Sequence, residues 1–311
     1  MEIFAIVIVV SILLYLMISY VVAKFCGVLL FTPPVNFRPT KEQVITNMAK
    51  EFASNHTMYA NANYEAYEKW ETEYFECDNN GVQIPAAYHP MENARGCVIL
   101  AHGFGQNRYA SVPYAEIFRN LGFSTILFDE RCFGESKAAY CSFGELEATD
   151  IVALIGWVKQ RCGADTKIIL HGVSMGAMSS MIALGLTDKI DYVIEDCGLA
   201  RTLIGASFVI HSMIPLPNPL MKMEIVRKAH SFGLQIEKNM PIKGVQNSNV
   251  PVCVIHGDAD TVVPVSDAKE IYAVCKNEKS RLEIFPGRVH GYSICDRERY
   301  ESVLADFLKD I

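Results

Sequence analysis

The clearest chemical signature in this 311-residue chain is Gly172-Val-Ser174-Met-Gly176, which follows one apolar run and precedes another with helical character. A G-x-S-x-G sequence between a strand and a helix predicts a sharp turn that lifts the serine hydroxyl clear of the sheet. Glycine is needed at 172 and 176 because side chains there would collide with neighbouring elements. Ser174 is therefore a candidate nucleophile for acyl transfer, with the Met175 N–H as one donor to the oxyanion that would form.

A serine hydroxyl is a weak nucleophile at neutral pH and needs a base beside it. Of the eight histidines, His290 lies in a loop between the last strand-like run and the final helical one. A loop at the carboxyl end of a strand can reach the edge of the sheet where Ser174 is expected. We therefore predict that His290 is the general base.

The base in turn needs an anionic partner that fixes its tautomer and stabilises the imidazolium. Asp260 lies in the turn beyond the strand-like run at 252–256, and we predict that it is this acid. Glu195 and Asp196, at the end of the preceding strand, are the alternative acids. We expect Asp258 to brace the turn through backbone hydrogen bonds.

Two loops after neighbouring strands complete the candidate site. The sequence His102-Gly-Phe104-Gly105 follows the third strand, and its glycines allow the backbone to approach a substrate carbonyl. The Phe104 N–H is therefore the second candidate oxyanion donor. We expect the next loop, at 128–136, to support the first through a turn that includes Asp129 and Arg131.

Strands and helices alternate along most of the chain after residue 71. The predicted strands are Glu73–Cys77, Val82–His89, Cys97–Ala101, Thr125–Asp129, Lys167–Gly172, Tyr192–Asp196, Val252–His256 and Arg281–Phe285. Asn79-Asn80-Gly81 predicts an antiparallel hairpin between the first two. The later strands are continuous apolar runs, which is typical of parallel strands covered on both faces. The pattern predicts an α/β fold with a mostly parallel sheet.

The interval between the sixth and seventh strands contains no convincing strand and is rich in methionine and phenylalanine. We predict that about 198–249 forms an insertion of short helices that lies over the sheet. Met213 and the run Pro215-Leu-Pro-Asn-Pro219 belong to this insertion, and Asn218 followed by proline indicates a helix start. Its methionines suggest an adaptable apolar pocket.

The N-terminal segment predicts a membrane anchor. Ile3 to Ala23 carries no charge, and as a helix it would span about 32 Å, close to the hydrocarbon core of a bilayer. A cleaved signal peptide is expected to have a basic start and a small-residue cleavage site, but this chain starts with Met1-Glu2 and no A-x-A follows. A buried core helix is expected to have a polar face, which the first turns lack. We therefore predict a transmembrane anchor at 1–31, a juxtamembrane connector and helix at 32–70, and a catalytic domain at 71–311.

Charge and cysteine content favour a cytoplasmic position for the catalytic domain. Lys24, Arg38, Lys41 and Lys50 follow the predicted span, as the positive-inside bias requires on the cytoplasmic side. The ten cysteines are scattered, as in a chain from a reducing compartment. The opposite side of the membrane stays open, because only Met1 and Glu2 precede the uncharged stretch.

Composition excludes several classes of protein. Half of the residues are apolar or aromatic, which excludes a disordered chain, and a net charge of −7 without a basic run argues against a nucleic-acid-binding surface. The absence of a C-x-x-C pair argues against a zinc knuckle or a thioredoxin-like redox site. No metal or organic cofactor is implied.

Five motifs in order resemble the α/β-hydrolase superfamily, and most of all its bacterial membrane-anchored, esterase-like members grouped with the serine aminopeptidase-type domain. These motifs are H-G-F-G (102–105), F-D-E-R-x-x-G-x-S (128–136), G-V-S-M-G (172–176), H-G-D-A-D-x-x-V-P (256–264) and V-H-G (289–291). The resemblance implies an eight-stranded sheet with a helical cap after strand six. It also implies a triad of Ser174, Asp260 and His290, whose chain order is that of the superfamily, and an oxyanion hole formed by Phe104 and Met175. Cys132 stands where the family usually has glycine.

The expected activity is the hydrolysis of carboxylic esters of moderate acyl length through an acyl-enzyme, with a small acyl ester as substrate. A serine aminopeptidase, in which Glu224 or Glu237 of the cap would bind a free amine, is the alternative. A hydrolase of acyl thioesters or lysophospholipids is also compatible with the anchor. The rival from another class is a non-catalytic, membrane-tethered scaffold with the same fold.

Overall fold

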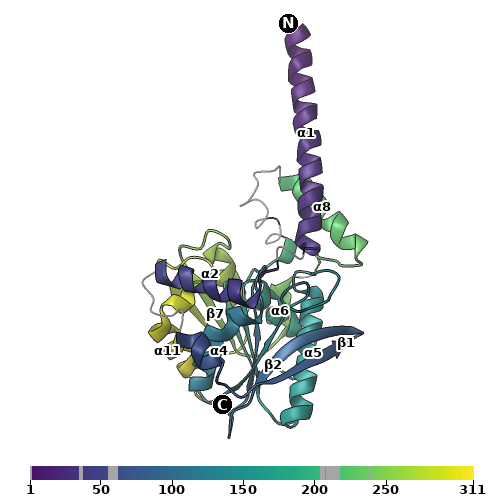
Figure 1. Cartoon of the computed structure of the whole chain (residues 1–311). Helices are drawn as coiled ribbons and strands as arrows, with labels where there is room; N and C mark the ends of the chain where they lie inside the picture. Colours follow the sequence, from purple (N-terminus) through teal and green to yellow (C-terminus); the bar gives the residue numbers. More distant parts are fainter. Residues whose placement is uncertain (1, 35–37, 55–61, 204–206, 208–217, 239) are drawn as a thin grey trace.

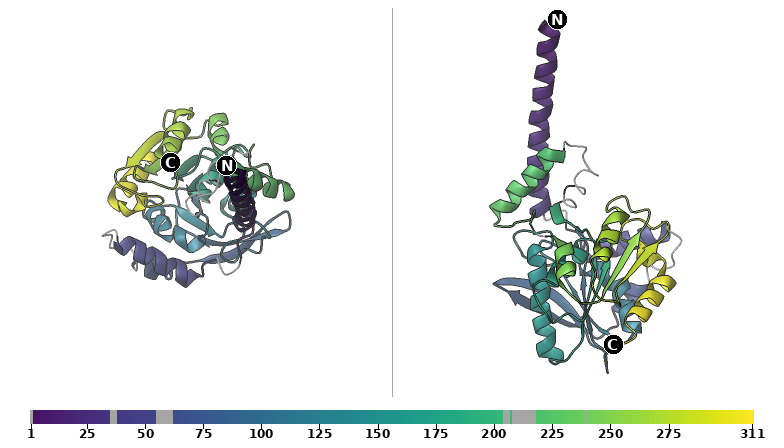
Figure 2. Two further views of the ribbon diagram at one scale, coloured as in Figure 1. Left: turned by 90° about the horizontal axis from the view of Figure 1, so that it is seen from above. Right: turned by 180° about the vertical axis from the view of Figure 1, so that it is seen from behind.

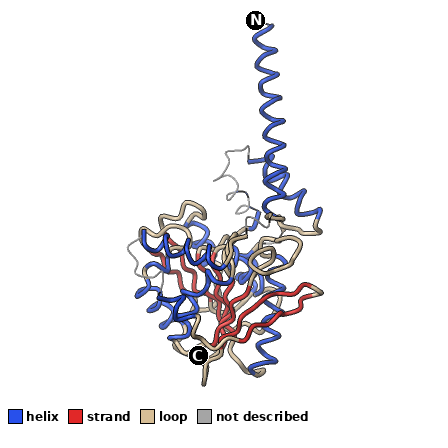
Figure 3. Tube along the Cα trace, viewed as in Figure 1, coloured by secondary structure: helices blue, strands red, loops and turns tan. Residues whose placement is uncertain are grey.

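The computed structural model describes residues 2–34, 38–54, 62–203, 207, 218–238 and 240–311. Its centre is an eight-stranded sheet with helices on both sides (Figure 3). Met213 and residues 215–217 of the predicted cap lie outside the described residues. The strands are β1 (Glu73–Asn79), β2 (Val82–His89), β3 (Cys97–Ala101), β4 (Ser124–Phe128), β5 (Ile168–Val173), β6 (Tyr192–Asp196), β7 (Val252–Gly257) and β8 (Arg281–Phe285).

The sheet has the order β1-β2-β4-β3-β5-β6-β7-β8. β2 pairs antiparallel with both β1 and β4, and the other neighbours pair parallel. In the hairpin turn between β1 and β2, Asn80 and Gly81 both have positive φ, of 54° and 83°, as the type I′ turn requires. The predicted strands and the predicted hairpin are therefore confirmed. The parallel strands bring the loops that follow β3, β5, β6, β7 and β8 to one edge of the sheet.

Helices cover both faces of the sheet because successive strand side chains point to opposite sides. The helices of the α/β region are α4 (Val112–Asn120), α5 (Glu145–Cys162), α6 (Met175–Ala183), α9 (Pro241–Asn247), α10 (Val265–Ala273) and α11 (Arg297–Phe307). Buried side chains of α4 and α11 form one core cluster with Val98 and Leu100 of β3. Those of α5, α6, α9 and α10 form the other, with Ile99 of the same strand.

The N-terminal helix α1 (Glu2–Phe31) projects from the rest of the molecule, with the N terminus at its far end (Figures 1 and 2). Residues Ile6–Phe31 are long and apolar enough to cross a membrane. Between Phe4 and Tyr20 the described side chains are exposed except Ser19. The helix therefore presents an apolar surface over most of its length, and only its last turns are buried.

The last turns of α1 pack against the cap. Helix α8 (Asn218–Ser231) begins at the residue that the sequence indicated and lies beside α1 (Figures 1 and 2). Gly27 faces α8, where an added Cβ would lie 3.5 Å from the Glu224 carbonyl oxygen. Ala23 and Ser19, one and two turns earlier, are also buried. Small residues at this spacing allow two helix backbones to approach closely.

The segment after α1 also forms helices, within the range 32–70 where a connector and a helix are predicted. α2 (Lys41–Ser54) and α3 (Ala62–Tyr67) lie over the α4 side of the sheet (Figure 1). Val44 of α2 is fully buried, and the Asn107 side chain donates to the Pro39 carbonyl at 2.9 Å. This segment is therefore packed on the α/β region.

Candidate active site

The strand β5 ends in the sharp turn that the G-x-S-x-G motif predicts. Ser174 has φ 55° and ψ −112°, a conformation that is strained for a residue with a side chain, and α6 begins at the next residue. Its N–H donates to the Asp196 carbonyl at 2.8 Å, which fixes the turn to β6. A Cβ at Gly172 would collide with the Gly176 carbonyl, and one at Gly176 with the Ala101 carbonyl. Glycine is therefore required at both positions.

The loop after β8 brings His290 to this serine. Ser174 Oγ lies 2.9 Å from His290 Nε2, and His290 Nδ1 lies 2.7 Å from Asp260 Oδ2. The three residues come from the loops after β5, β7 and β8, so the parallel sheet brings together side chains 116 and 30 positions apart. The hydroxyl, the imidazole and the carboxylate form one chain of hydrogen bonds.

Asp260 is held as a carboxylate by several donors. Its Oδ1 accepts the N–H groups of Val262 and Val263, each at 2.8 Å, and the His256 ring lies 3.3 Å from Oδ2. Burial alone would raise the pKa of Asp260, but hydrogen bonds from His256, His290 and the Val263 N–H outweigh it and hold that pKa well below its usual range. The side chain is buried and ready to stabilise an imidazolium.

His256 is a second imidazole beside this acid, and no role is predicted for it from the motifs. Burial disfavours its charge, yet hydrogen bonds to Asp260 and to the Val263 carbonyl raise the pKa of His256 to about 9. Both imidazoles contact Asp260 at Oδ2, and His290 is the one that also contacts Ser174 Oγ. Its i, i+4 spacing to Asp260 within the H-G-D-A-D motif is the signal that could have identified this pair.

The alternative acids lie at the end of β6. The Asp196 carboxyl accepts from the Tyr300 hydroxyl at 3.1 Å, and the Glu195 carboxyl accepts from the Gly198 N–H at 2.8 Å. Burial raises the pKa of Asp196 to about 6 and that of Glu195 to about 8. Among the described residues, Asp260 is the carboxyl group bonded to His290 Nδ1. Asp258 instead accepts the Gly287 N–H at 2.6 Å and so links two loops.

The two candidate oxyanion donors come from the residue after the serine and from the loop after β3. The Met175 N–H is among the first N–H groups of α6, which have no acceptor within their own helix. Phe104 lies in the loop after β3, which the buried His102 ring holds through the Gly103 carbonyl at 2.8 Å and the Glu130 N–H at 3.0 Å. Phe104 and Ser174 both line one cavity of about 230 Å³.

That cavity receives a side chain from outside the predicted catalytic domain. Met48 of α2 lines it together with Tyr114, His290 and Tyr292. No motif in the sequence pointed to Met48, because a lone methionine in an amphipathic helix has no distinctive signal. None of the described residues that line the cavity is acidic.

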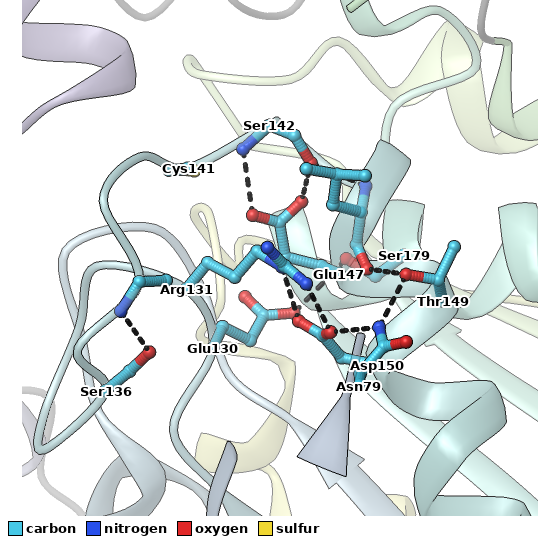
Figure 4. Close-up of polar contacts among 12 residues, drawn as sticks. Asn79, Glu130, Arg131, Ser136, Cys141, Ser142, Glu147, Thr149, Asp150 and Ser179 are labelled. Carbon is cyan, nitrogen blue, oxygen red and sulfur yellow. Dashed lines mark hydrogen bonds and ion pairs between the residues drawn. The ribbon is translucent and has the colours of Figure 1, made fainter. Parts of the chain in front are cut away.

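The loop at 128–136 supports the site through two separate ion pairs. The Asp129 carboxylate accepts from the Arg108 guanidinium at 2.6 Å, and Arg131 forms a bidentate pair with Asp150 of α5, with both distances 2.7 Å (Figure 4). Asp129 and Arg131 thus bind other partners instead of each other. Cys132 has φ 68°, the left-handed conformation that favours the glycine usual at this position.

Comparisons with known proteins agree with this architecture. The model of the prolyl oligopeptidase family matches residues 135–310, more than half of the chain. The Bacillus subtilis protein YqkD is 24% identical over 253 residues, which are 80% of this chain and 83% of that protein. The human protein ABHD12B is 24% identical over 70% of this chain and 62% of its own length.

Solved structures share the fold at lower identity. The Pyrococcus furiosus esterase Pf2001 superposes with a TM-score of 0.64 and 22% identity, over 79% of this chain and 94% of that one. A bromoperoxidase from Bacillus anthracis gives a TM-score of 0.57 and 17% identity, over 76% and 100% of the two chains. Proteins named for different activities, an esterase and a bromoperoxidase, share this fold, so the reaction must be argued from the site.

These findings confirm the superfamily that the five motifs indicated, and they identify a hydrolase. The family model that matches is that of the prolyl oligopeptidase family, whereas the motifs most resembled the serine aminopeptidase-type grouping. The chain belongs to the prolyl oligopeptidase family, within the α/β-hydrolase superfamily.

Proposed function

We propose that this hydrolase cleaves carboxylic esters through an acyl-enzyme, with Ser174 as nucleophile, His290 as general base and Asp260 as the acid that orients it. The observation that carries the proposal is the chain of hydrogen bonds from Ser174 Oγ to His290 at 2.9 Å and on to Asp260 at 2.7 Å. Nucleophile and base are at hydrogen-bonding distance, and a third group fixes the base.

The reaction follows from these contacts. Ser174 Oγ attacks the ester carbonyl carbon as its proton moves to His290 Nε2, and the carbonyl oxygen becomes an oxyanion between the Phe104 and Met175 N–H groups. His290 gives its proton to the leaving alkoxide as the C–O bond breaks. Water then attacks the acyl-serine, with His290 again as base, and releases the carboxylic acid. Asp260 stays ionised throughout and stabilises the imidazolium.

Esters are favoured over peptides with a free amino terminus because the described cavity wall offers no carboxylate to an ammonium group. The two acids considered for that role have other partners: Glu224 is buried and paired with Arg227 at 2.8 Å, and Glu237 is paired with His230 at 2.8 Å. The aminopeptidase alternative would need the amine to be bound elsewhere.

We also propose that α1 is a membrane anchor and that the hydrolase lies on the cytoplasmic side. The exposed apolar surface of α1 and the basic residues after it, such as Lys24, support this arrangement. Cys162 is exposed and offers a direct test of the side. A membrane-impermeant maleimide should label Cys162 in broken cells but not in intact ones, and equal labelling in both would place the hydrolase outside.

The test of the enzyme uses a fluorophosphonate probe and a panel of p-nitrophenyl esters beside aminoacyl anilides. The full chain in detergent should be labelled and should hydrolyse esters, whereas Ser174→Ala should lose labelling and about 10⁶-fold in kcat, the cost of removing a serine nucleophile. Hydrolysis of the anilides with inert esters would favour the aminopeptidase. A folded protein that neither reacts with the probe nor hydrolyses any substrate would be the scaffold.

A further inference from the structure

The last residue of α1 lies in a cluster of aromatic side chains that reaches the candidate oxyanion hole. The Phe31 ring is fully buried and packs edge-on against Phe143, with ring centroids 6.1 Å apart. On another side it contacts Phe232, just after the cap helix α8, at 6.2 Å. Phe31 thus joins the proposed membrane helix to the cap and to the loop that contains Phe143.

Phe143 in turn contacts the residue proposed to donate to the oxyanion. Its ring stacks on Phe104 with centroids 5.0 Å apart and an interplanar angle of 27°. Phe133, from the start of the same loop, packs edge-on against Phe104 at 5.1 Å. The Phe104 side chain therefore contacts two rings of the 131–144 loop, and Phe104 lines the same cavity as Ser174.

The 131–144 loop is fixed at both ends within the α/β region. At its start Arg131 pairs with Asp150, and at its end Glu147 accepts the N–H groups of Ser142 and Gly144 at 2.8 and 2.9 Å (Figure 4). Asp150 and Glu147, which hold the two ends of the loop, are buried side chains of α5. The middle of the loop depends on other contacts.

Arg108 pairs with Glu135 at 2.8 Å from the α/β region, and further contacts come from the end of α1 and the segment that follows it. The Phe31 carbonyl accepts the Cys141 N–H at 2.8 Å, and the Arg38 guanidinium donates to the Ser136 carbonyl at 3.3 Å. A helix leaves its last carbonyl groups without partners in the helix, so the loop satisfies one that α1 cannot. The end of α1 thus holds both the backbone of the loop and the ring that supports Phe104.

We propose that Phe31 is a positioning residue for the loop that contains Phe104, the candidate oxyanion donor. The end of the proposed membrane anchor would thus complete the ester-hydrolysing site. The inference rests on the proposed function. Its physical basis is that an oxyanion donor acts only at hydrogen-bonding distance from the developing charge, and that loss of one donor costs about 10²–10³ in kcat. Phe31 acts through Phe143 and Phe104 and touches no reacting atom.

The test compares Phe31→Ala with Phe25→Ala in the full chain in detergent. Phe25 lies on the same helix, but its side chain is 61% exposed, so its loss removes an aromatic ring without touching the cluster. Hydrolysis of a water-soluble ester, p-nitrophenyl butyrate, is expressed per serine titrated to completion with the fluorophosphonate. This normalisation removes any loss that comes only from misfolded molecules.

We expect Phe31→Ala to lower kcat per titrated serine by about tenfold, because one oxyanion donor is partly displaced. Phe25→Ala should stay within about twofold of the unmodified chain. KM should change less than kcat, and the pH at which activity falls on the acid side should not move, because the Ser174–His290–Asp260 chain is untouched. Phe31→Leu, which keeps bulk but no ring, should give an intermediate kcat.

An unchanged kcat per titrated serine in both Phe31 variants would overturn the inference, as would an equal loss in Phe25→Ala. If Phe31→Ala does not fold, Phe31→Leu and Phe143→Leu decide the question by the same measure. Failure of the proposed function looks different: the unmodified chain would then show no Ser174-dependent labelling or ester hydrolysis at all.

Discussion

The carboxyl groups at the end of β6 and after β7 lie in opposite electrostatic surroundings, and the residues of β6 are the more deeply buried. Asp260, after β7, has two backbone N–H groups and two imidazoles as partners, and its pKa is lowered. Glu195 and Asp196, at the end of β6, each leave one oxygen without a described partner, and burial raises their pKa values to about 8 and 6. Deeper burial with few donors raises the pKa of the β6 carboxyl groups, whereas the larger number of donors around Asp260 outweighs its burial and keeps it ionised.

The largest effect that would sharpen this comparison is the loss of the charge at 260. Asp260→Asn should lower kcat for a p-nitrophenyl ester by about 10⁴, because a neutral amide neither stabilises the imidazolium nor fixes its tautomer. Asp196→Asn, the matched control, should stay within about tenfold of the unmodified chain, since its carboxyl group binds the Tyr300 hydroxyl and not His290. Similar losses in both variants would assign the acid to the end of β6 or divide its role between the two strands.

The pKa of Glu195 predicts a dependence of stability on pH. A carboxyl group whose folded pKa is about 8, against an ordinary 4.5, binds a proton in the folded state that the unfolded chain has lost. The free energy of unfolding that this raised pKa contributes is fully present below the pKa of the unfolded chain, and it is lost as the pH rises toward 8. Glu195→Gln, neutral at every pH, should therefore lose less stability than the unmodified chain between pH 5 and 8, by on the order of 3 kcal/mol.

Urea unfolding at the two pH values measures this difference, provided that each transition is two-state. Glu278→Gln is the control, because Glu278 is exposed and its neutralisation should change both values equally. A pH dependence that is the same in Glu195→Gln and in the unmodified chain would show that Glu195 is ionised in the folded state. The contrast between the ends of β6 and β7 would then be lost.

The fold and the three residues of the proposed triad could be predicted because their signals are local. Strand-forming runs such as Cys97–Ala101 are short and continuously apolar, and the turn at Asn80-Gly81 requires residues that tolerate positive φ. Ser174 lies in a pentapeptide whose glycines are dictated by contacts with neighbouring backbone. A parallel sheet then brings the loops after its strands to one edge, so chain order alone indicates that these loops meet.

The contacts of α1 and α2 with the site could not be predicted in this way. Phe31 meets Phe143, and Met48 reaches the cavity, through apolar packing between segments far apart in the chain. Such packing is non-directional and leaves no spacing rule in the sequence. The boundaries at 31 and 70 rest on composition and stay predictions about where the chain divides. Side chains of both N-terminal segments pack against residues of the α/β region.

The smallest expected effect concerns the wall that α2 contributes to the cavity. Met48→Ala should enlarge the cavity beside Ser174 without touching the three hydrogen-bonded side chains, so kcat should change little. Binding of the acyl group should respond instead: KM should rise by about two- to fivefold for the ester that fills the present cavity, because one buried apolar contact is worth roughly 1 kcal/mol or less when the site can relax. Asn47→Ala, exposed on the same turn of α2, should leave both constants unchanged.

KM measured across p-nitrophenyl esters of increasing chain length tests this, and a shift in the preferred length toward longer chains would show that α2 sets the size of the substrate. Equal kinetics in the two variants would mean that Met48 borders the cavity without contacting the bound ester.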